Sequence, residues 1–264
     1  MYYGKTLTIV MPAYNEEANI AMAVKSFLDV PEVDEVLVIN NNSTDKTREE
    51  AVKAGAQVID EFNQGYGYAC RRGLIEADSD FVAIVEPDGT FRPSDLYKFF
   101  TYITEFDAVF GSRTNRSCIW DGANMNWALR MGNVLVAKLL EYLHNGPCLT
   151  DVGCTYKMFT RPAIDAVKDY FTVGKSHFSP ELMMLCIRRK MRIVEIPLHY
   201  QSRVGQSKIT GDIKKAVKLG FVMIGLIFKY RLKHIPTLVG CGSGRAVPQP
   251  NTGHVAPGAG THSH

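Results

Sequence analysis

An uninterrupted apolar run that stops at two carboxylates constrains the fold of this chain more than any other feature. Residues 81–85 read Phe-Val-Ala-Ile-Val, and Glu86, Pro87 and Asp88 follow them directly. Strands that are buried in a parallel sheet read as continuous apolar runs of this kind. Open α/β sheets bind ligands beyond the carboxyl ends of their strands, and two carboxylates there suit a divalent cation that also touches phosphates. A polar turn that only ends a strand would explain the same residues equally well.

The rest of the first half alternates short apolar strands with helices. Strands are predicted at residues 7–11, 36–39, 57–59, 81–85 and 108–110, and helices at 16–28, about 44–54, 68–77 and 94–103. Asn15 is expected to cap the first helix, and Ser43 or Thr44 the second. Strands that alternate with helices of about a dozen residues predict βαβ units and a mainly parallel sheet. The predicted fold class is therefore α/β.

The second half is less regular. It contains a polar loop at 114–124, a predicted helix at 126–143, a loop entering a strand at 151–159, a helix capped by Ser179, a strand at 192–197, a basic loop at 199–208 and a long helix at 213–233. Residues 236–264 are rich in Gly, Pro, Ser, Thr and His and nearly uncharged. This composition is typical of a disordered tail.

The composition argues against several classes of protein. The net charge of +3 does not indicate a general nucleic-acid binder. The six cysteines form no CxxC pair, which favours reduced thiols in a cytosolic setting. The N-terminal apolar stretch is too short for a signal peptide, and the longest apolar run, 219–228, is too short to span a membrane. No GxGxxG follows the first strand and no GxxxxGK[ST] is present, so neither a Rossmann dinucleotide site nor a P-loop is expected.

Polar residues follow three predicted strands, at 12–16, 40–45 and 86–88. Because the carboxyl ends of parallel strands share one edge of a sheet, these residues make a nucleotide pocket plausible there.

The order of the motifs resembles family 2 inverting glycosyltransferases of the GT-A fold, and within them most closely the polyprenyl-phosphate (dolichyl-phosphate) mannose or glucose synthases. The motifs are VMPAYNEEANI (10–20), VLVINNNSTDKT (36–47), NQGYGYACRRGL (63–74), VEPDGTFRP (85–93), FGSR (110–113), DVGCTYKMFTR (151–161) and EIPLHYQSRVGQSKITG (195–211). Each motif alone is a weak signal. Together they cover roughly residues 6–235 in the order found in the family.

The resemblance implies a GT-A domain over residues 1–235, with a nucleotide-sugar-binding half (1–113), an acceptor half (114–210) and an amphipathic helix (211–235). The residues it assigns to the UDP- or GDP-linked hexose are Pro12, Ala13, Tyr14, Glu16, Asn41, Asp45, Gly67, Glu86, Arg203 and Lys208. Glu86 and Asp88 would hold Mg²⁺ or Mn²⁺ against the diphosphate. Arg203 and Lys208 would close over it, so Asp88 and Arg203 are also expected to act in catalysis.

The implied acceptor is a polyprenyl phosphate, with Arg113 and Arg130 as candidates for binding its phosphate, although either could be an ordinary surface arginine. An ionised phosphate needs no strong base, whereas a hydroxyl acceptor would. Asp151 is the first candidate for that base and Glu181 the second; a loop cap and a first-turn helix carboxylate are the competing interpretations. The same fold acting on a hydroxyl of a protein, nucleic acid or saccharide is therefore one alternative function.

The chain departs from the family pattern at two places. Asn40-Asn41-Asn42-Ser43 stands where the family often has Asp-Asp-Gly-Ser, and Glu86 replaces the usual first Asp of the DxD motif. An amide can donate as well as accept, so base contacts would change in geometry. These departures also motivate a second alternative, a non-catalytic nucleotide-sugar-binding module. A nucleotidyltransferase is a more distant third.

The predicted helix at 213–233 places lysines and arginines around an apolar face. A basic amphipathic helix suits an anionic membrane surface, so peripheral attachment to the cytoplasmic face of a membrane is one hypothesis. An ordinary helix that packs its apolar face on the domain is the other.

Overall fold

A computed structural model of the chain describes residues 1–120, 122–123, 127–203, 213–233 and 235. Within these residues, one sheet holds the strands β1 (Leu7–Ala13), β2 (Glu35–Asn40), β3 (Gln57–Asp60), β4 (Phe81–Ile84), β5 (Ala108–Ser112), β6 (Lys157–Thr160) and β7 (Ile193–Pro197). Their order across the sheet is β3-β2-β1-β4-β6-β5-β7. Lys208 and the predicted tail at 236–264 lie outside the described residues.

The sheet is mainly parallel, as predicted. β1 pairs in parallel with β2 and β4, β2 with β3, and β5 with β7. β6 is the exception, because it runs antiparallel between β4 and β5. Strands from both proposed halves thus belong to one sheet, and β6 carries the segment before it to the edge where β4 ends.

Successive side chains of β1 point to opposite faces of the sheet and pack in two separate cores. Leu7, Ile9 and Met11 pack with α1 (Ile20–Leu28), α2 (Thr47–Lys53) and α4 (Leu96–Ile103). Val10 packs on the other face, with α3 (Tyr66–Glu76), α6 (Arg161–Val167) and α7 (Phe178–Arg188). Since both faces are covered by helices, the strands can be apolar throughout. Short 3₁₀ helices lie at Pro93–Asp95, Arg116–Cys118 and Lys168–Tyr170.

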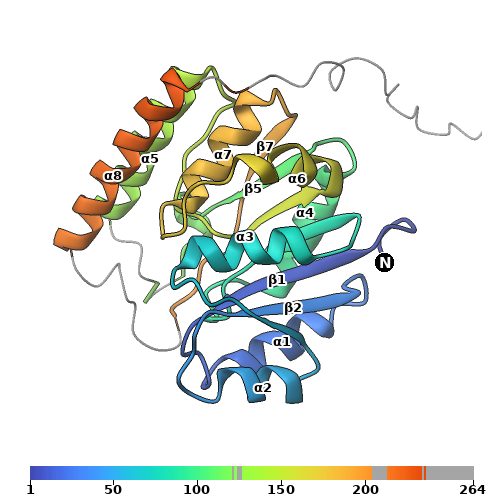
Figure 1. The fold of residues 1–264 in the computed structure, drawn as a ribbon. Helices are drawn as coiled ribbons and strands as arrows, with labels where there is room; N and C mark the ends of the chain where they lie inside the picture. Colours follow the sequence, from blue (N-terminus) through green and yellow to red (C-terminus); the bar gives the residue numbers. More distant parts are fainter. Residues whose placement is uncertain (121, 124–126, 204–212, 234, 236–264) are drawn as a thin grey trace, which may run out of the picture.

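The long helices α5 (Trp127–His144) and α8 (Ile213–Leu232) lie side by side at one end of the molecule (Figure 1). The His144 ring nitrogen Nε2 lies 3.1 Å from the carbonyl oxygen of Ile227, which joins the two helices. Among the helices that the structure describes, none is long and apolar enough to cross a bilayer.

Three predicted helix caps are wrong. α1 begins at Ile20 and α2 at Thr47, after Asn19 and Lys46. Asn15 has a positive φ of 53° and its side-chain oxygen accepts a hydrogen bond from Thr44 N at 2.9 Å. The predicted cap residues therefore tie the 13–19 and 41–46 loops together, because loops that meet at one sheet edge must satisfy their own backbone groups.

Ser179 does not cap α7 either, since the helix begins one residue before it. Its hydroxyl lies inside the protein, where it donates to Val152 O at 2.9 Å and accepts from the buried Lys157 Nζ at 2.8 Å. The contact fastens the start of α7 to the loop that precedes β6.

Candidate active site

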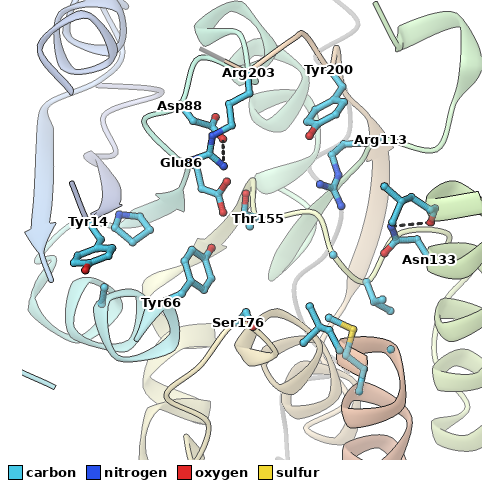
Figure 2. A pocket seen from close by; sticks show the side chains of 18 of the residues that line it. Tyr14, Tyr66, Glu86, Asp88, Arg113, Asn133, Thr155, Ser176, Tyr200 and Arg203 are labelled. Atoms are coloured by element: carbon cyan, nitrogen blue, oxygen red, sulfur yellow. Dashed lines mark hydrogen bonds and ion pairs between the residues drawn. The ribbon is translucent and has the colours of Figure 1, made fainter. Parts of the chain in front are cut away.

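A cavity of about 510 Å³ opens at the carboxyl ends of β1, β2 and β4 (Figure 2). Among its lining residues are nine of the predicted site residues: Pro12, Ala13, Tyr14, Glu16, Asn41, Glu86, Asp88, Arg113 and Arg203. The strand ends line one end of the cavity, and α5 and α8 line the other. One space therefore joins residues that come from both proposed halves of the chain.

Glu86 and Asp88 share the cavity with an arginine that arrives from the far end of the chain. Arg203 Nη1 lies 3.3 Å from Asp88 Oδ2, and Arg203 Nη2 lies 3.0 Å from Glu16 Oε1. The other Asp88 oxygen accepts hydrogen bonds from the backbone and hydroxyl of Thr90, at 3.0 and 2.6 Å. Asp88 is therefore held in place by its own turn through one oxygen, and its other oxygen faces the Arg203 guanidinium.

The surroundings of Glu86 disfavour its charge. Burial and the negative charge of Asp88 raise the pKa of Glu86 to about 8, although Arg203 and Arg113 act in the opposite direction. A divalent cation between the two carboxylates would remove this repulsion.

These two carboxylates fit a divalent cation that also binds phosphate. In the part of the chain that the structure describes, no group of three or more His, Cys, Asp or Glu side chains could hold a metal ion by itself. Glu86 and Asp88 would supply two oxygen ligands, leaving the remaining positions to phosphate and water. Mg²⁺ is usually held in this manner, with one or two carboxylates and substrate phosphates.

The raised pKa of Glu86 predicts a pH dependence of folding stability in EDTA. The folded chain holds its proton on Glu86 up to about pH 8, whereas an unfolded glutamate releases it near its ordinary pKa of 4.5. Stability should therefore fall as pH rises from about 5 to 8, with a limiting slope of about 1.4 kcal/mol per pH unit. Urea denaturation across this range measures the slope. Glu86→Gln should flatten it and the exposed Glu49→Gln should not; an unchanged slope in Glu86→Gln would contradict the prediction.

The side-chain amide of Asn41 forms hydrogen bonds with the loop that follows β3 through both its nitrogen and its oxygen. Its amide nitrogen donates to Glu61 O at 3.0 Å and to Asn63 O at 2.7 Å, and its oxygen accepts from Gly65 N at 2.8 Å. A carboxylate could not donate to those two carbonyls, so an amide suits this position. Asn42 has φ of +57°, a left-handed conformation that glycine and asparagine adopt readily. The departure from Asp-Asp-Gly-Ser thus has a structural reason.

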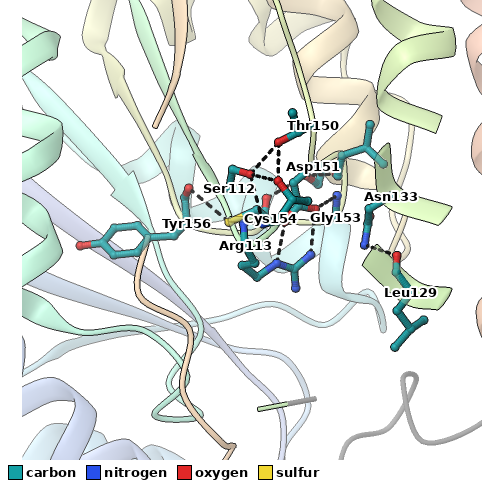
Figure 3. Close-up of polar contacts among 12 residues, drawn as sticks. Ser112, Arg113, Leu129, Asn133, Thr150, Asp151, Gly153, Cys154 and Tyr156 are labelled. Carbon is teal, nitrogen blue, oxygen red and sulfur yellow. Dashed lines mark hydrogen bonds and ion pairs between the residues drawn. The ribbon is translucent and has the colours of Figure 1, made fainter. Parts of the chain in front are cut away.

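Arg113 and Asp151 form a buried, two-pronged ion pair (Figure 3). Arg113 Nε lies 2.9 Å from Asp151 Oδ2 and Nη2 lies 3.0 Å from Oδ1, while the Arg113 backbone N donates to Oδ2 at 3.0 Å. Burial alone would raise the pKa of Asp151, but the Arg113 charge and hydrogen bonds hold it below its ordinary value. Both carboxylate oxygens are occupied, so Asp151 orients Arg113 toward the cavity.

Gly153 makes room for this arrangement. A Cβ atom on Gly153 would lie 2.9 Å from both Arg113 Nη2 and Asn133 Oδ1. A side chain there would crowd both of these polar groups, which line the cavity. Asn133 lies on α5 and was not predicted as a site residue, because nothing in its sequence neighbourhood distinguishes it from a surface amide.

Comparison with known proteins identifies the family. Residues 8–167 match the sequence model of glycosyl transferase family 2. The chain belongs to this family. An uncharacterised glycosyltransferase of Mycobacterium tuberculosis (strain ATCC 25618 / H37Rv) is 30% identical over 216 residues, which cover 81% of this chain and 94% of that protein. A dolichyl-phosphate hexose transferase of Haloferax volcanii is 28% identical over 209 residues, covering 79% of this chain and 88% of that protein.

The fold of this family 2 glycosyltransferase is also that of solved structures. Glucosyl-3-phosphoglycerate synthase from Mycobacterium tuberculosis, crystallised with Mn²⁺, uridine diphosphate and phosphoglyceric acid, superposes with a TM-score of 0.68 at 19% identity. The match covers 86% of this chain and 79% of that one. The same synthase was crystallised with Mg²⁺ and uridine diphosphate. This likeness confirms the predicted GT-A fold.

Several predicted site residues of the family 2 glycosyltransferase do not line the cavity. Asp45 accepts hydrogen bonds from the backbones of Thr47 and Glu17, at 3.0 and 3.2 Å, and so holds the start of α2. Arg130, on α5, is half-buried and absent from the cavity wall, and Gly67 packs on the backbone of residues 173–175. Lys208 lies outside the described residues.

Glu181 lies in the first turn of α7 and is fully buried. Its carboxylate accepts from the backbones of Thr172 and Val173, at 3.0 and 2.9 Å, and from the Tyr230 hydroxyl at 2.5 Å. It therefore fastens α8 to the domain, and a role as a base in the cavity has no support from its position.

Proposed function

We propose that this chain is an inverting hexosyltransferase that moves a hexose from a UDP- or GDP-linked donor to a polyprenyl phosphate. One observation carries the proposal: a single cavity runs from the strand-end carboxylates, past Arg113, to the apolar walls of α5 and α8. The nucleoside diphosphate of the donor would lie at the strand-end carboxylates, the acceptor phosphate at Arg113, and the hydrocarbon chain of the acceptor between α5 and α8. The relative named as a dolichyl-phosphate hexose transferase supports the same acceptor class.

The donor end would be built by β1 and β4. Tyr14, which is 39% exposed, presents a ring at the mouth of the cavity beside the turn that ends β1. Glu86 and Asp88 would hold Mg²⁺ or Mn²⁺, which when bound neutralises charge on the leaving diphosphate. Arg203 already bridges Glu16 and Asp88, so a small rotation would bring its guanidinium to the diphosphate.

The acceptor end would centre on Arg113. Its guanidinium is locked by Asp151 and lines the cavity, a geometry that suits the planar recognition of a phosphate. The acceptor oxygen would attack the anomeric carbon as the bond to the diphosphate breaks on the opposite side. An ionised phosphate oxygen needs no general base. Both Asp151 oxygens are paired with Arg113, so the first base candidate for a hydroxyl acceptor is already engaged, which favours the phosphate acceptor.

The exposed side of α8 supports a lipid acceptor presented by an anionic bilayer. Phe221 and Leu232 are 70% and 88% exposed, and Val217 and Phe228 lie along the same side of the helix. Trp127 and Tyr142 of α5 add exposed aromatic rings. Lys218, Lys229 and Arg231 are exposed on α8 and complement anionic headgroups. Because α5 and α8 also wall the apolar end of the cavity, a prenyl chain would pass from the bilayer to Arg113 without crossing water.

A matched pair of acceptors tests the proposed function. We expect transfer of labelled hexose to a polyprenyl phosphate in anionic vesicles and none to the polyprenol of the same chain length, because only the phosphate is ionised and pairs with Arg113. UDP- and GDP-linked glucose and mannose, each with Mn²⁺ or EDTA, would be the donors. Phe221→Glu should reduce both vesicle flotation and transfer there, while transfer to a short, water-soluble prenyl phosphate persists.

Equal transfer to the polyprenol would instead indicate a hydroxyl-specific enzyme. Donor binding without transfer to any acceptor would indicate a non-catalytic binding module. Either result would overturn the proposed acceptor.

A further inference from the structure

We propose that Tyr66, Thr155 and Ser176 form the subsite that binds the hexose of the donor. In this subsite the Thr155 and Ser176 hydroxyls would form hydrogen bonds with the hydroxyls of the sugar. This inference rests on the proposed function and names the side chains that choose the sugar. Neither the predicted nucleotide, metal and acceptor residues nor the ion pair of Arg113 accounts for these three residues.

Their place in the cavity follows the path of the reaction. The transferred hexose must lie between the diphosphate, at Glu86 and Asp88, and the acceptor phosphate, at Arg113. Tyr66, Thr155 and Ser176 line the same cavity. In Figure 2, Thr155 lies beside Glu86 on the side of Arg113, and Tyr66 and Ser176 lie across the space below Glu86. The three side chains come from α3, from the loop before β6 and from the loop before α7.

The Thr155 hydroxyl is buried and has no hydrogen-bond partner among the described residues. Buried hydroxyls nearly always form a hydrogen bond. An unpaired hydroxyl in the wall of a cavity therefore indicates that a ligand or a water molecule binds there. Thr155 is half-buried and lines the cavity, so rotation about its Cα–Cβ bond would present the hydroxyl to a bound sugar. Sugar hydroxyls both donate and accept, and can therefore pair with it in either sense.

The wall of the cavity opposite Thr155 is formed where the backbone of residues 65–68 packs closely on the backbone of residues 173–175. Gly65 has φ of +152°, and a Cβ atom on it would lie 2.2 Å from Gly174 O. A Cβ atom on Gly67 would lie 2.7 Å from Val173 O, and Tyr68 N donates to Gly174 O at 3.1 Å. The start of α3 is thereby pressed against the 173–175 backbone, which places Tyr66 and the neighbouring Ser176 at one wall. Neither Gly65 nor Gly67 lines the cavity, so these glycines shape the subsite through backbone packing.

Substitution of Thr155 by valine tests the subsite through two measurements, the melting temperature and kcat/KM, which we expect to change in different directions. Valine keeps the shape and removes the hydroxyl. Since that hydroxyl is unpaired in the free protein, Thr155→Val should leave the melting temperature unchanged or raise it. It should lower kcat/KM for the UDP- or GDP-hexose that the wild-type chain transfers by about tenfold, the value of one hydrogen bond. Affinity for the free nucleoside diphosphate should not change, because the sugar is absent.

Ser176→Ala should show the same pattern, and both variants should narrow the preference between glucose and mannose donors. Thr101→Val is the matched control: the Thr101 hydroxyl donates to Tyr97 O within its own helix at 3.0 Å, outside the cavity, and its loss should not affect transfer. The inference is wrong if both variants transfer hexose within about twofold of wild type. It is equally wrong if nucleoside diphosphate affinity falls in step with transfer. A wild-type chain that neither binds nor transfers any donor would overturn the proposed function itself, and the subsite with it.

Discussion

Asp88→Asn is expected to lower hexose transfer by about a thousandfold and to abolish the stabilisation that Mn²⁺ gives in the presence of a nucleoside diphosphate. Asp88 keeps one oxygen on Thr90 and offers the other to a cation, here Arg203. The amide would preserve the turn while removing the charge. Loss of a single group that stabilises charge in a transition state typically costs about 10²–10³ in rate, and the metal would be lost as well.

Initial rates with the preferred donor, together with thermal shifts at several Mn²⁺ concentrations, measure this effect. A ligand that binds only the folded state must raise apparent stability. Asp78→Asn is the matched control, because Asp78 is exposed and precedes β4, so it lies at the opposite end of that strand. Full activity of Asp88→Asn, with an undiminished Mn²⁺ shift, would show that the cation binds elsewhere or is not used.

The second large effect concerns the Arg113–Asp151 pair. Asp151→Asn should destabilise the fold by about 3–5 kcal/mol, since removing one member of a buried pair leaves the other charge uncompensated. Transfer should fall by about a hundredfold at temperatures where the variant is folded, because Arg113 would no longer be held in one orientation. Urea denaturation and initial rates measure the two losses separately.

A double variant separates stability from function at this pair. Arg113→Met with Asp151→Leu should recover most of the lost stability, because apolar residues often replace a buried ion pair at little cost. It should not recover transfer if Arg113 binds the acceptor phosphate. Recovery of both would mean that the pair only supports the fold, and the acceptor site would then have to be sought elsewhere along the cavity.

The position of the carboxylates was predictable because it depends on local pattern. The apolar run of β4 forms a buried strand, and the polar residues that follow must emerge at its carboxyl end beside those of β1 and β2. Tyr14, Glu16 and Glu86 accordingly line one cavity, and their binding of the donor stays a prediction. Neighbouring polar residues in the same turns, such as Asn15 and Ser43, were wrongly predicted as helix caps, because loop-to-loop hydrogen bonds compete with capping.

The sequence by itself determined the alternation of strands and helices, the binding edge and the family. Tertiary structure alone decided that β6 is inserted antiparallel, that Asp151 is occupied by Arg113, and that Thr155 and Ser176 face the space below Glu86. The physical reason is the distance along the sequence between the residues that interact. Strand ends follow from side-chain periodicity over a few residues, whereas the Arg113–Asp151 pair joins residues 38 positions apart. Such a contact depends on the tertiary structure, and no local pattern encodes it.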